Sequence, residues 1–264
     1  LISLVEYQSL LQKFNVETKT LYHTREWLQS LEVGLNVSVH VICSLLEDGN
    51  PVALTPFCFK RIGPIGVCGS PLRGTHTDSL GPIFLDNTVD NAIIDGVIQS
   101  QHKLLLNNNQ LIEWRWNRDC FRSKFVSKTL AKLGYEAVPK LTNVIFLSAG
   151  QDEIWVRMEG RARNAIRKSQ KLDVKIKWVK PDEEWVKNYY KMLSEVYSRQ
   201  NKVSPHPLTL YQSLADPALV KNVKFVQGGK NRQQSTYKAL KYFLLCIVLH
   251  HHLKFLNCPT QIKD

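Results

Sequence analysis

The stretch from Ile154 to Lys171 separates into two chemically opposite faces when it is read at helical spacing. The first face is apolar or small and consists of Ile154, Met158, Ala162, Ala165, Ile166 and Ser169. The opposite face consists of Arg157, Arg161, Asn164, Lys168 and Lys171, with Arg163 and Arg167 on its flank. Because guanidinium groups bind phosphate through paired hydrogen bonds, the pattern predicts an anionic cofactor or substrate. For this helix taken alone, a solvated basic face is the simpler interpretation.

Positive charge is concentrated in the second half of the chain. Residues 1–150 carry 14 Lys and Arg against 13 Asp and Glu, a net charge of +1. Residues 151–264 carry 21 against 10, a net charge of +11. A hydrophobic fraction of 44% over 264 residues is typical of a soluble protein with room for two domains. The anion-attracting surface therefore belongs to the second half, where nucleic acid, a nucleotide-type cofactor or an anionic lipid surface could bind.

The basic stretch resembles the signature of one enzyme family. Its residues match the Arg-Asn-x-Ile-Arg-Lys-Ala-x-Lys pattern of the FemABX-like acyltransferases at Arg163, Asn164, Ile166, Arg167, Lys168 and Lys171, with Ser169 in place of the usual Ala. Three later segments are similar to the family too: Val174–Trp178 to its strand, Asp182–Arg199 to its long helix, and Ser204–Pro207 to its proline-containing turn. The resemblance covers roughly residues 20 to 228.

FemABX-like proteins are double-domain relatives of the GNAT N-acyltransferases. The resemblance therefore implies an α/β fold with mixed, largely antiparallel GNAT-like sheets flanked by helices, in tandem. It implies an N-terminal GNAT-like domain over residues 1–149 and a C-terminal one over residues 150–264, a boundary where the charge balance also shifts. After about residue 228 the chain departs from the family pattern, because a polar segment, apolar Ala239–Leu249 and three histidines replace further strands. The second domain is expected to be incomplete or altered there.

The resemblance implies an N-acyltransferase that moves an acyl or aminoacyl group from an acyl-CoA or an aminoacyl-tRNA to an amine, as in cell-envelope or peptidoglycan metabolism. The amine would attack the donor directly, so positioning is the main contribution and neither a protein nucleophile nor a metal is required. Arg163, Arg167 and Lys168 would contact phosphate or pyrophosphate of the donor or of a nucleotide-linked acceptor, with Arg161 and Lys171 in support. No catalytic residue is assigned.

Two questions stay open: whether the donor is acyl-CoA or aminoacyl-tRNA, and whether the chain is an enzyme or a binding module. Members of the family that use aminoacyl-tRNA often carry a coiled-coil arm, and the lack of a sustained heptad pattern here favours acyl-CoA. A non-catalytic basic module of the same fold, binding nucleic acid or another polyanion, would also explain the charge of the second half. Against it, the chain lacks the interleaved aromatic and basic residues that stack bases.

Local patterns predict the remaining elements. Val37–Leu46, the turn Asp48-Gly49 and Pro51–Phe59 predict a hairpin whose second strand is central, because it is apolar on both faces. Gly- and Pro-rich Arg61–Gly81 is expected to be a loop, either an ordinary connection or, by the resemblance, one that shapes the cleft. Further helices are expected over Thr24–Leu31, Asn87–Leu106, Lys124–Leu133, 153–171, 182–199 and 207–214, and further strands over Leu111–Asn117, Thr142–Leu147, 173–179 and Val223–Val226.

Tyr197 and His206 are the candidates for residues of a substrate cleft. Tyr197 either borders the cleft or packs in the core, beside a stripe of Trp185, Tyr189, Leu193 and Val196. His206 lies between two prolines in an extended connection and could hydrogen-bond a substrate, although a lone exposed His usually has no function. Glu113 and Arg115 alternate along one strand and are interpreted as a structural pair.

Cysteine usage and the lack of long apolar runs predict a cytoplasmic protein. The six cysteines lack CxxC spacing, and Cys43 and Cys58 fall in apolar strand patterns that favour buried thiols. Leu1–Val5 does not resemble a signal peptide, and no run approaches the ~20 apolar residues of a membrane-spanning helix. The triple histidine at 250–252 is interpreted as surface decoration, so no metal site is predicted.

Overall fold

The computed structural model describes residues 1–14, 20–86, 89–116, 123–138, 150–171, 176–216 and 225–228. By its internal contacts the chain divides into two compact units. Among these described residues, the first unit comprises those up to 138 together with 182–216, and the second comprises those from 150 to 181 together with 225–228. The domain boundary at residues 149–150 stays a prediction, but residues 182–216 join the first unit rather than the second.

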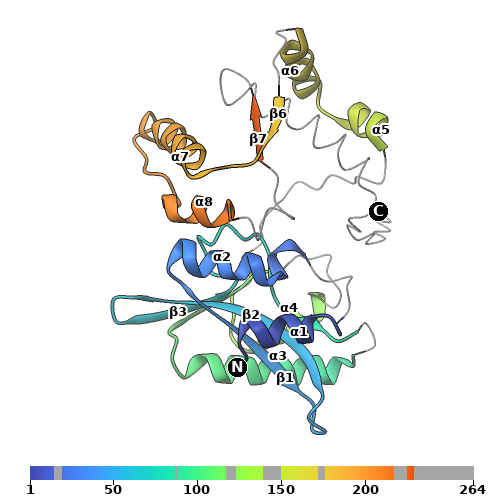
Figure 1. Ribbon diagram of the computed structural model, residues 1–264. Coiled ribbons are helices and arrows are strands. Elements are labelled where there is room, and N and C mark those ends of the chain that lie inside the picture. The colour runs from blue at the N-terminus through green and yellow to red at the C-terminus, as the bar shows by residue number, and fades with distance from the viewer. Residues whose placement is uncertain are drawn as a thin grey trace. The chain divides into compact units, whose positions relative to one another are not determined.

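The first unit is built on one mixed sheet (Figure 1). Its strands are β1 (Ser38–Leu45), β2 (Pro51–Ile62), β3 (Ile65–Ser70), β4 (Ile83–Phe84) and β5 (Leu111–Trp114). The strand order is β1-β2-β3-β5, with β4 paired to β2, and every pair is antiparallel except β3 with β5. The central position of β2 is confirmed, and its residues from Val52 to Cys58 are continuously buried. A mixed, largely antiparallel sheet flanked by helices confirms the expected fold class.

The turn between β1 and β2 forms where the Asp48-Gly49 pair predicts it. The two strands pair from Ser38 opposite Phe59 to Leu45 opposite Pro51. Gly49 has a φ of +82°, a conformation that glycine adopts without a Cβ clash. The side chain of Asp48 accepts a hydrogen bond from the Asn50 backbone nitrogen at 2.9 Å, which closes the turn.

The expectation that residues 61–81 form a loop is wrong in part, because residues 65–70 form β3. Gly66 and Gly69 lie inside this strand. A Cβ on Gly66 would stand 2.4 Å from the carbonyl oxygen of Asn108, and a Cβ on Gly69 would stand 2.6 Å from the Cα of Leu72. Here glycine marks a close approach of two backbones rather than a loop, which composition alone does not distinguish.

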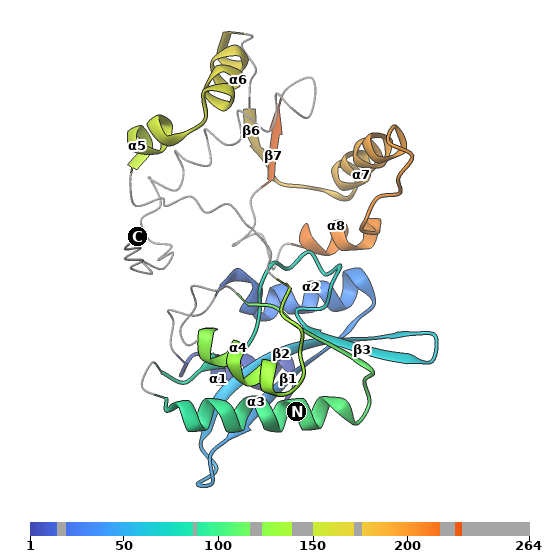
Figure 2. The ribbon, with the colours of Figure 1, turned by 180° about the vertical axis from the view of Figure 1, so that it is seen from behind.

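Helices cover both faces of this sheet. In Figure 1, α1 (Leu4–Leu11) and α2 (Arg25–Leu35) lie on one face, with the short 3-10 helix η2 (Leu21–His23) between them in sequence. Figure 2 shows α3 (Asn91–Leu106) and α4 (Ser123–Lys132) on the other face. The first layer contributes Tyr7, Leu28 and Leu31 to a core with Val41 and Leu54, and the second contributes Ile94, Ile98 and Val126 to a core with Val52 and Ala53.

The ends of these helices follow their capping residues. Thr24 caps α2, and its hydroxyl accepts a hydrogen bond from the Trp27 backbone nitrogen at 3.3 Å. Gly134 follows α4 with a φ of +86°, as expected of a glycine at a helix C-terminus. The expected helices near 24–31, 87–106 and 124–133 are therefore confirmed, with small shifts of their ends.

The helices α7 (Glu183–Ser198) and α8 (Leu208–Leu214) complete the first unit. α8 packs on α2, and its residue Leu210 is fully buried. The hydroxyl of Thr209 donates a hydrogen bond to the carbonyl oxygen of Gly34 at 2.7 Å, and the hydroxyl of Ser213 donates one to the carbonyl oxygen of Ser30 at 2.9 Å. A Cβ on Gly34 would stand only 2.6 Å from the Ser213 hydroxyl oxygen and 2.7 Å from the Leu210 Cα. Glycine therefore permits this close helix crossing.

The apolar stripe expected on α7 is only partly buried. The buried residue of this helix is Val186, whereas Tyr189 is 37% exposed. The aromatic residues instead contact α8: the rings of Tyr189 and Tyr190 lie 5.6 and 5.7 Å from that of Tyr211. The expected stripe is confirmed in part, because Trp185, Leu193, Val196 and Tyr197 are half-buried. Its aromatic part is a partly exposed cluster with Tyr211 of α8 rather than the deepest part of the interface.

The second unit contains α5 (Gly150–Arg157), α6 (Gly160–Lys171), β6 (Ile176–Val179) and β7 (Phe225–Gly228). The two strands pair antiparallel, with Ile176 opposite Gly228. The expectation of one continuous helix over 153–171 is wrong, because the helix is interrupted between Arg157 and Gly160. Glycine disfavours a helix interior by about 1 kcal/mol relative to Ala, which helps to place a new helix start here.

Some sequence predictions fall outside the described residues. These are the strand Thr142–Leu147, the beginning of the strand near 173, the segment Ala239–Leu249, the histidines 250–252 and Cys120, Cys246 and Cys258. Among the helices that the structure describes, none combines the length and the apolar character needed to cross a membrane.

Candidate functional site

The cations of the family-like signature lie on α6, and the helix is amphipathic as predicted. Ile166 is 1% exposed, and Ala162 and Ala165 are half-buried, whereas Arg161, Arg167, Lys168 and Lys171 are exposed. The apolar stripe and the cationic face therefore have the burial that their spacing predicts, although they now belong to a shorter helix.

Arg163 and Arg167 connect α6 to α5. The guanidinium of Arg163 donates to the carbonyl oxygen of Val156 at 3.1 Å, near the end of α5, where unpaired carbonyls favour a cation. The guanidinium of Arg167 lies 5.6 Å from the centre of the Trp155 ring and donates to the side chain of Asn164 at 3.3 Å. Both arginines therefore help to hold the two helices together, whether or not they bind a ligand.

The other three cations of α6 do not contact α5 in this way. Within the described part of the chain, the side chains of Arg161, Lys168 and Lys171 make no hydrogen bond or ion pair that would occupy their charge. By contrast, Arg157 of α5 forms an ion pair with Glu153 one turn earlier. Arg161, Lys168 and Lys171 are therefore the cations of this segment best able to bind an anion. The phosphate-binding role of all five cations of α6 stays a prediction.

Tyr197 and His206, the candidate cleft residues, lie near each other in sequence at the end of α7 and in the connection to α8. Tyr197 is half-buried. Together with Tyr189 and Tyr190 it contributes to the electrostatic environment of Tyr211, whose pKa rises to about 12, chiefly because the phenol is buried. Tyr211 is therefore a neutral hydrogen-bonding phenol at physiological pH. A cleft role for Tyr197 is not tested by this packing.

His206 is not a lone exposed histidine. It is half-buried, and its Nε2 atom lies 3.2 Å from the Nδ1 atom of His76, with the two rings nearly perpendicular. Burial, and then the electrostatic effect of the neighbouring His76, lowers the pKa of His206, against a smaller opposing effect of the Gly74 backbone. Its own Nδ1 atom is buried and makes no hydrogen bond of standard geometry within the described residues. The neutral imidazole is thus the favoured form near pH 7.

The segment that carries His76 is rigidly held. The hydroxyl of Thr77 accepts a hydrogen bond from the Trp27 indole at 3.0 Å, and the hydroxyl of Thr75 donates to the carbonyl oxygen of Leu72 at 2.7 Å. His76 itself has a φ of +55°, in the left-handed region that non-glycine residues rarely adopt. Strained backbone of this kind persists only where the surrounding structure determines it, and it is common at functional sites.

Hydrogen bonds anchor both ends of the same segment. The buried hydroxyl of Ser70 donates to the carbonyl oxygen of Pro56 at 2.6 Å and accepts from the backbone nitrogen of Gly81 at 3.0 Å. The carboxylate of Glu113 accepts from the Arg73 backbone nitrogen and from the Arg115 guanidinium, both at 2.8 Å. Glu113 and Arg115 therefore act as the structural pair that their alternation predicts. Together these contacts make residues 71–81 an ordered platform for His76.

Sequence reasoning missed His76, because it stands 130 residues from His206 and no local pattern connects them. The free cysteines show no comparable constellation within the described residues. Cys58 and Cys68 are buried, which raises the pKa of each thiol to about 12, and Cys43 is half-buried. The expected burial is therefore confirmed for Cys58 but only in part for Cys43, and burial raises the pKa of the Cys43 thiol as well. No group of three or more metal-ligating side chains occurs among the residues that the structure describes.

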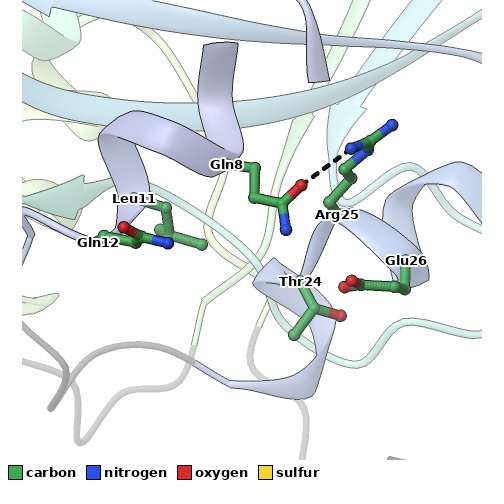
Figure 3. Close-up of a pocket in the computed structure, with 6 residues that line it drawn as sticks. All are labelled: Gln8, Leu11, Gln12, Thr24, Arg25 and Glu26. Atoms are coloured by element: carbon green, nitrogen blue, oxygen red, sulfur yellow. Dashed lines mark hydrogen bonds between the residues drawn. The ribbon is translucent and has the colours of Figure 1, made fainter. Parts of the chain in front are cut away.

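A shallow pocket lies between α1 and the start of α2 (Figure 3). Its lining consists of Gln8, Leu11, Gln12, Thr24, Arg25 and Glu26. The guanidinium of Arg25 is already bonded to the side chain of Gln8 at 2.9 Å, as the dashed line in Figure 3 shows. The pocket therefore offers no concentrated charge or nucleophile, and none of the predicted site residues lines it.

Comparison with known proteins supports the fold. No protein-family model matches the sequence, and neither does any curated protein sequence. The crystal structure of FemX is similar, with a TM-score of 0.57 and 13% sequence identity, over 94% of this chain and 61% of the FemX chain. This chain thus spans about 61% of the length of FemX. At this identity the similarity establishes a FemX-like fold, and it assigns no activity or substrate.

Proposed function

We propose that this chain is an N-acyltransferase of the FemABX type, which transfers an acyl or aminoacyl group to an amine. The fold of FemX supports the transferase class. The observation that carries the proposal is the exposed cationic face of α6, where the family-like signature falls: Arg161, Lys168 and Lys171 have no competing partner among the described residues. Guanidinium and ammonium groups on one helix face suit the phosphates that acyl-CoA and aminoacyl-tRNA have in common.

The proposed role of α6 is to bind donor phosphates. A phosphate held by several of these cations would fix the position of the donor, and positioning can supply most of the rate enhancement in a direct attack by an amine. Arg163 and Arg167 would contribute phosphate contacts and also keep α5 and α6 together through Val156 and Trp155. Exposed cations bind anions only modestly one at a time, so the effect depends on the group.

Removing the three unoccupied charges is expected to weaken donor binding at least tenfold. Arg161→Ala/Lys168→Ala/Lys171→Ala should raise the Kd for acetyl-CoA or for aminoacyl-tRNA, whichever the protein uses, because three charged contacts to phosphate are lost. A tenfold rise corresponds to about 1.4 kcal/mol, shared over the three contacts. Titration followed by thermal shift and by isothermal calorimetry measures this. Arg163→Ala/Arg167→Ala should weaken binding too, and should also destabilise the α5–α6 segment.

The matched control removes charge from another helix. Lys124→Ala/Lys128→Ala/Lys132→Ala takes three exposed lysines, spaced one turn apart, from α4 in the first unit and should leave donor affinity unchanged. Equal losses in the α6 and α4 variants would indicate nonspecific attraction to the net charge of +12 and would count against a donor site on α6. A steep fall of affinity with salt for every polyanion, including heparin, would favour the non-catalytic binding module instead.

A further inference from the structure

His76 and His206 form a preorganised pair of imidazoles that the proposed transferase reaction does not use. Both belong to the first unit, and their facing nitrogens are 3.2 Å apart. We infer that this pair is a binding site for a divalent transition-metal ion such as Zn²⁺, held by the Nδ1 atom of His76 and the Nε2 atom of His206. The inference is independent of α6 and of any donor.

The separation of the two nitrogens suits one shared ion. Zinc binds imidazole nitrogen at about 2.0–2.1 Å with tetrahedral angles, which places two such nitrogens about 3.3 Å apart. The ring centroids lie 4.9 Å apart with an interplanar angle of 80°. Two imidazoles on one tetrahedral ion would have centroids about 5.2 Å apart, whereas a collinear N–H···N hydrogen bond would place them about 5.5 Å apart. The bent arrangement therefore resembles two lone pairs that converge on a common point.

Both ligands are held in place before any ion binds. His76 is fixed at its positive φ by the ordered segment 71–81. His206 is fixed by the flanking prolines and by the hydroxyl of Ser204, which donates to its carbonyl oxygen at 3.0 Å. α8, the next element along the chain, is anchored on α2. Because little conformational entropy remains to be lost, two ligands of this kind bind an ion more tightly than two mobile surface histidines.

The surroundings of each ring leave the correct nitrogen available. His76 is exposed, so an ion bound at its Nδ1 atom can complete its coordination with water. The Nδ1 atom of His206 is buried, which directs its Nε2 atom toward His76. Two protein ligands leave two of the four tetrahedral positions for water.

The test is a Zn²⁺ titration of the full chain by isothermal calorimetry, with ZnCl₂ as the probe. His250→Ser/His251→Ser/His252→Ser serves as the background, because three adjacent histidines could bind zinc by themselves. In this background we expect one Zn²⁺ per chain. His206→Ala and, separately, His76→Asn should each lower the affinity at least tenfold, while His40→Ala, which removes an exposed histidine from β1, should not change it.

Two variants keep the test decisive. Asn tolerates a positive φ better than most residues, so His76→Asn should preserve the fold even if His206→Ala does not, and thermal unfolding verifies this. Absence of a one-to-one zinc complex in the background protein would overturn the inference. An affinity that is equal in His76→Asn and His40→Ala would overturn it as well, and would reduce the pair to a hydrogen bond between two imidazoles.

Discussion

Gly34→Ala is expected to lower the free energy of unfolding by about 2 kcal/mol, because overpacking a close contact costs about 1–3 kcal/mol. The added Cβ would stand 2.6 Å from the hydroxyl oxygen of Ser213 and 2.7 Å from the Cα of Leu210. The second contact is with backbone, so α8 would have to move away from α2 as a whole. That movement would also lengthen the hydrogen bonds that Thr209 and Ser213 donate to α2. Urea denaturation followed by far-ultraviolet circular dichroism measures the loss.

Gly96→Ala is the matched control for this prediction. Gly96 is exposed in the middle of α3, and a Cβ there would meet nothing within 4 Å. The same substitution should therefore stabilise the protein by about 0.5–1 kcal/mol, the helix propensity gained over glycine. The two variants are expected to have opposite signs. If Gly34→Ala also stabilised the protein, α8 would not lie on α2 and the assignment of residues 182–216 to the first unit would be wrong.

Phe57→Ala is expected to cost about 4 kcal/mol, within the range for removing a buried phenylalanine. Phe57 lies on the central strand β2, is fully buried, and contacts Trp114 of β5 edge-on with ring centroids 4.9 Å apart. Its removal leaves a cavity in the cluster that also contains Ile42, Cys68 and Leu105. The surrounding strands are joined by hydrogen bonds on both sides of β2, so they cannot collapse into the space.

Phe59→Ala provides the comparison on the same strand. Phe59 is only half-buried and packs its ring against His40, 5.4 Å away. The loss there should be about half that of Phe57→Ala or less, because less apolar surface returns to water. Equal losses at the two positions would contradict the difference in burial between Phe57 and Phe59. Chemical denaturation of both variants under the same conditions gives the comparison.

Local signals in the sequence predicted local structure well. The Asp48-Gly49 turn, the Thr24 cap and the Gly134 helix end all rest on a backbone conformation or hydrogen bond within four residues. The strand β3 was missed because Gly66 and Gly69 normally indicate loops. Here they allow contacts with Asn108 and Leu72, which depend on how the sheet is assembled. The break in the helix at Gly160 was missed because the amphipathic pattern continues across it.

Long-range features could not be predicted from the pattern. The spacing of aromatic residues in α7 predicts an amphipathic helix, but it does not predict what this helix packs against. In the structure Tyr189 contacts Tyr211 of α8, and α8 packs on α2. A proline-flanked His206 likewise gives no indication of His76, because only the tertiary fold brings them within 3.2 Å. The cationic face of α6, by contrast, was evident from the sequence. The structure adds that Arg163 and Arg167 already contact Val156 and Trp155 of α5.

The most direct test of the transferase proposal is whether the protein moves a labelled group from a donor to an amine. The full chain would be incubated with labelled acetyl-CoA, or with labelled aminoacyl-tRNA, and a panel of amines that includes lysine-containing peptides. We expect label to appear on an amine only when the protein is present, and Arg161→Ala/Lys168→Ala/Lys171→Ala to lower the rate at least tenfold at limiting donor. Label that stays on both donors, although the protein is folded and binds them, would contradict the proposal and identify α6 as part of a binding module.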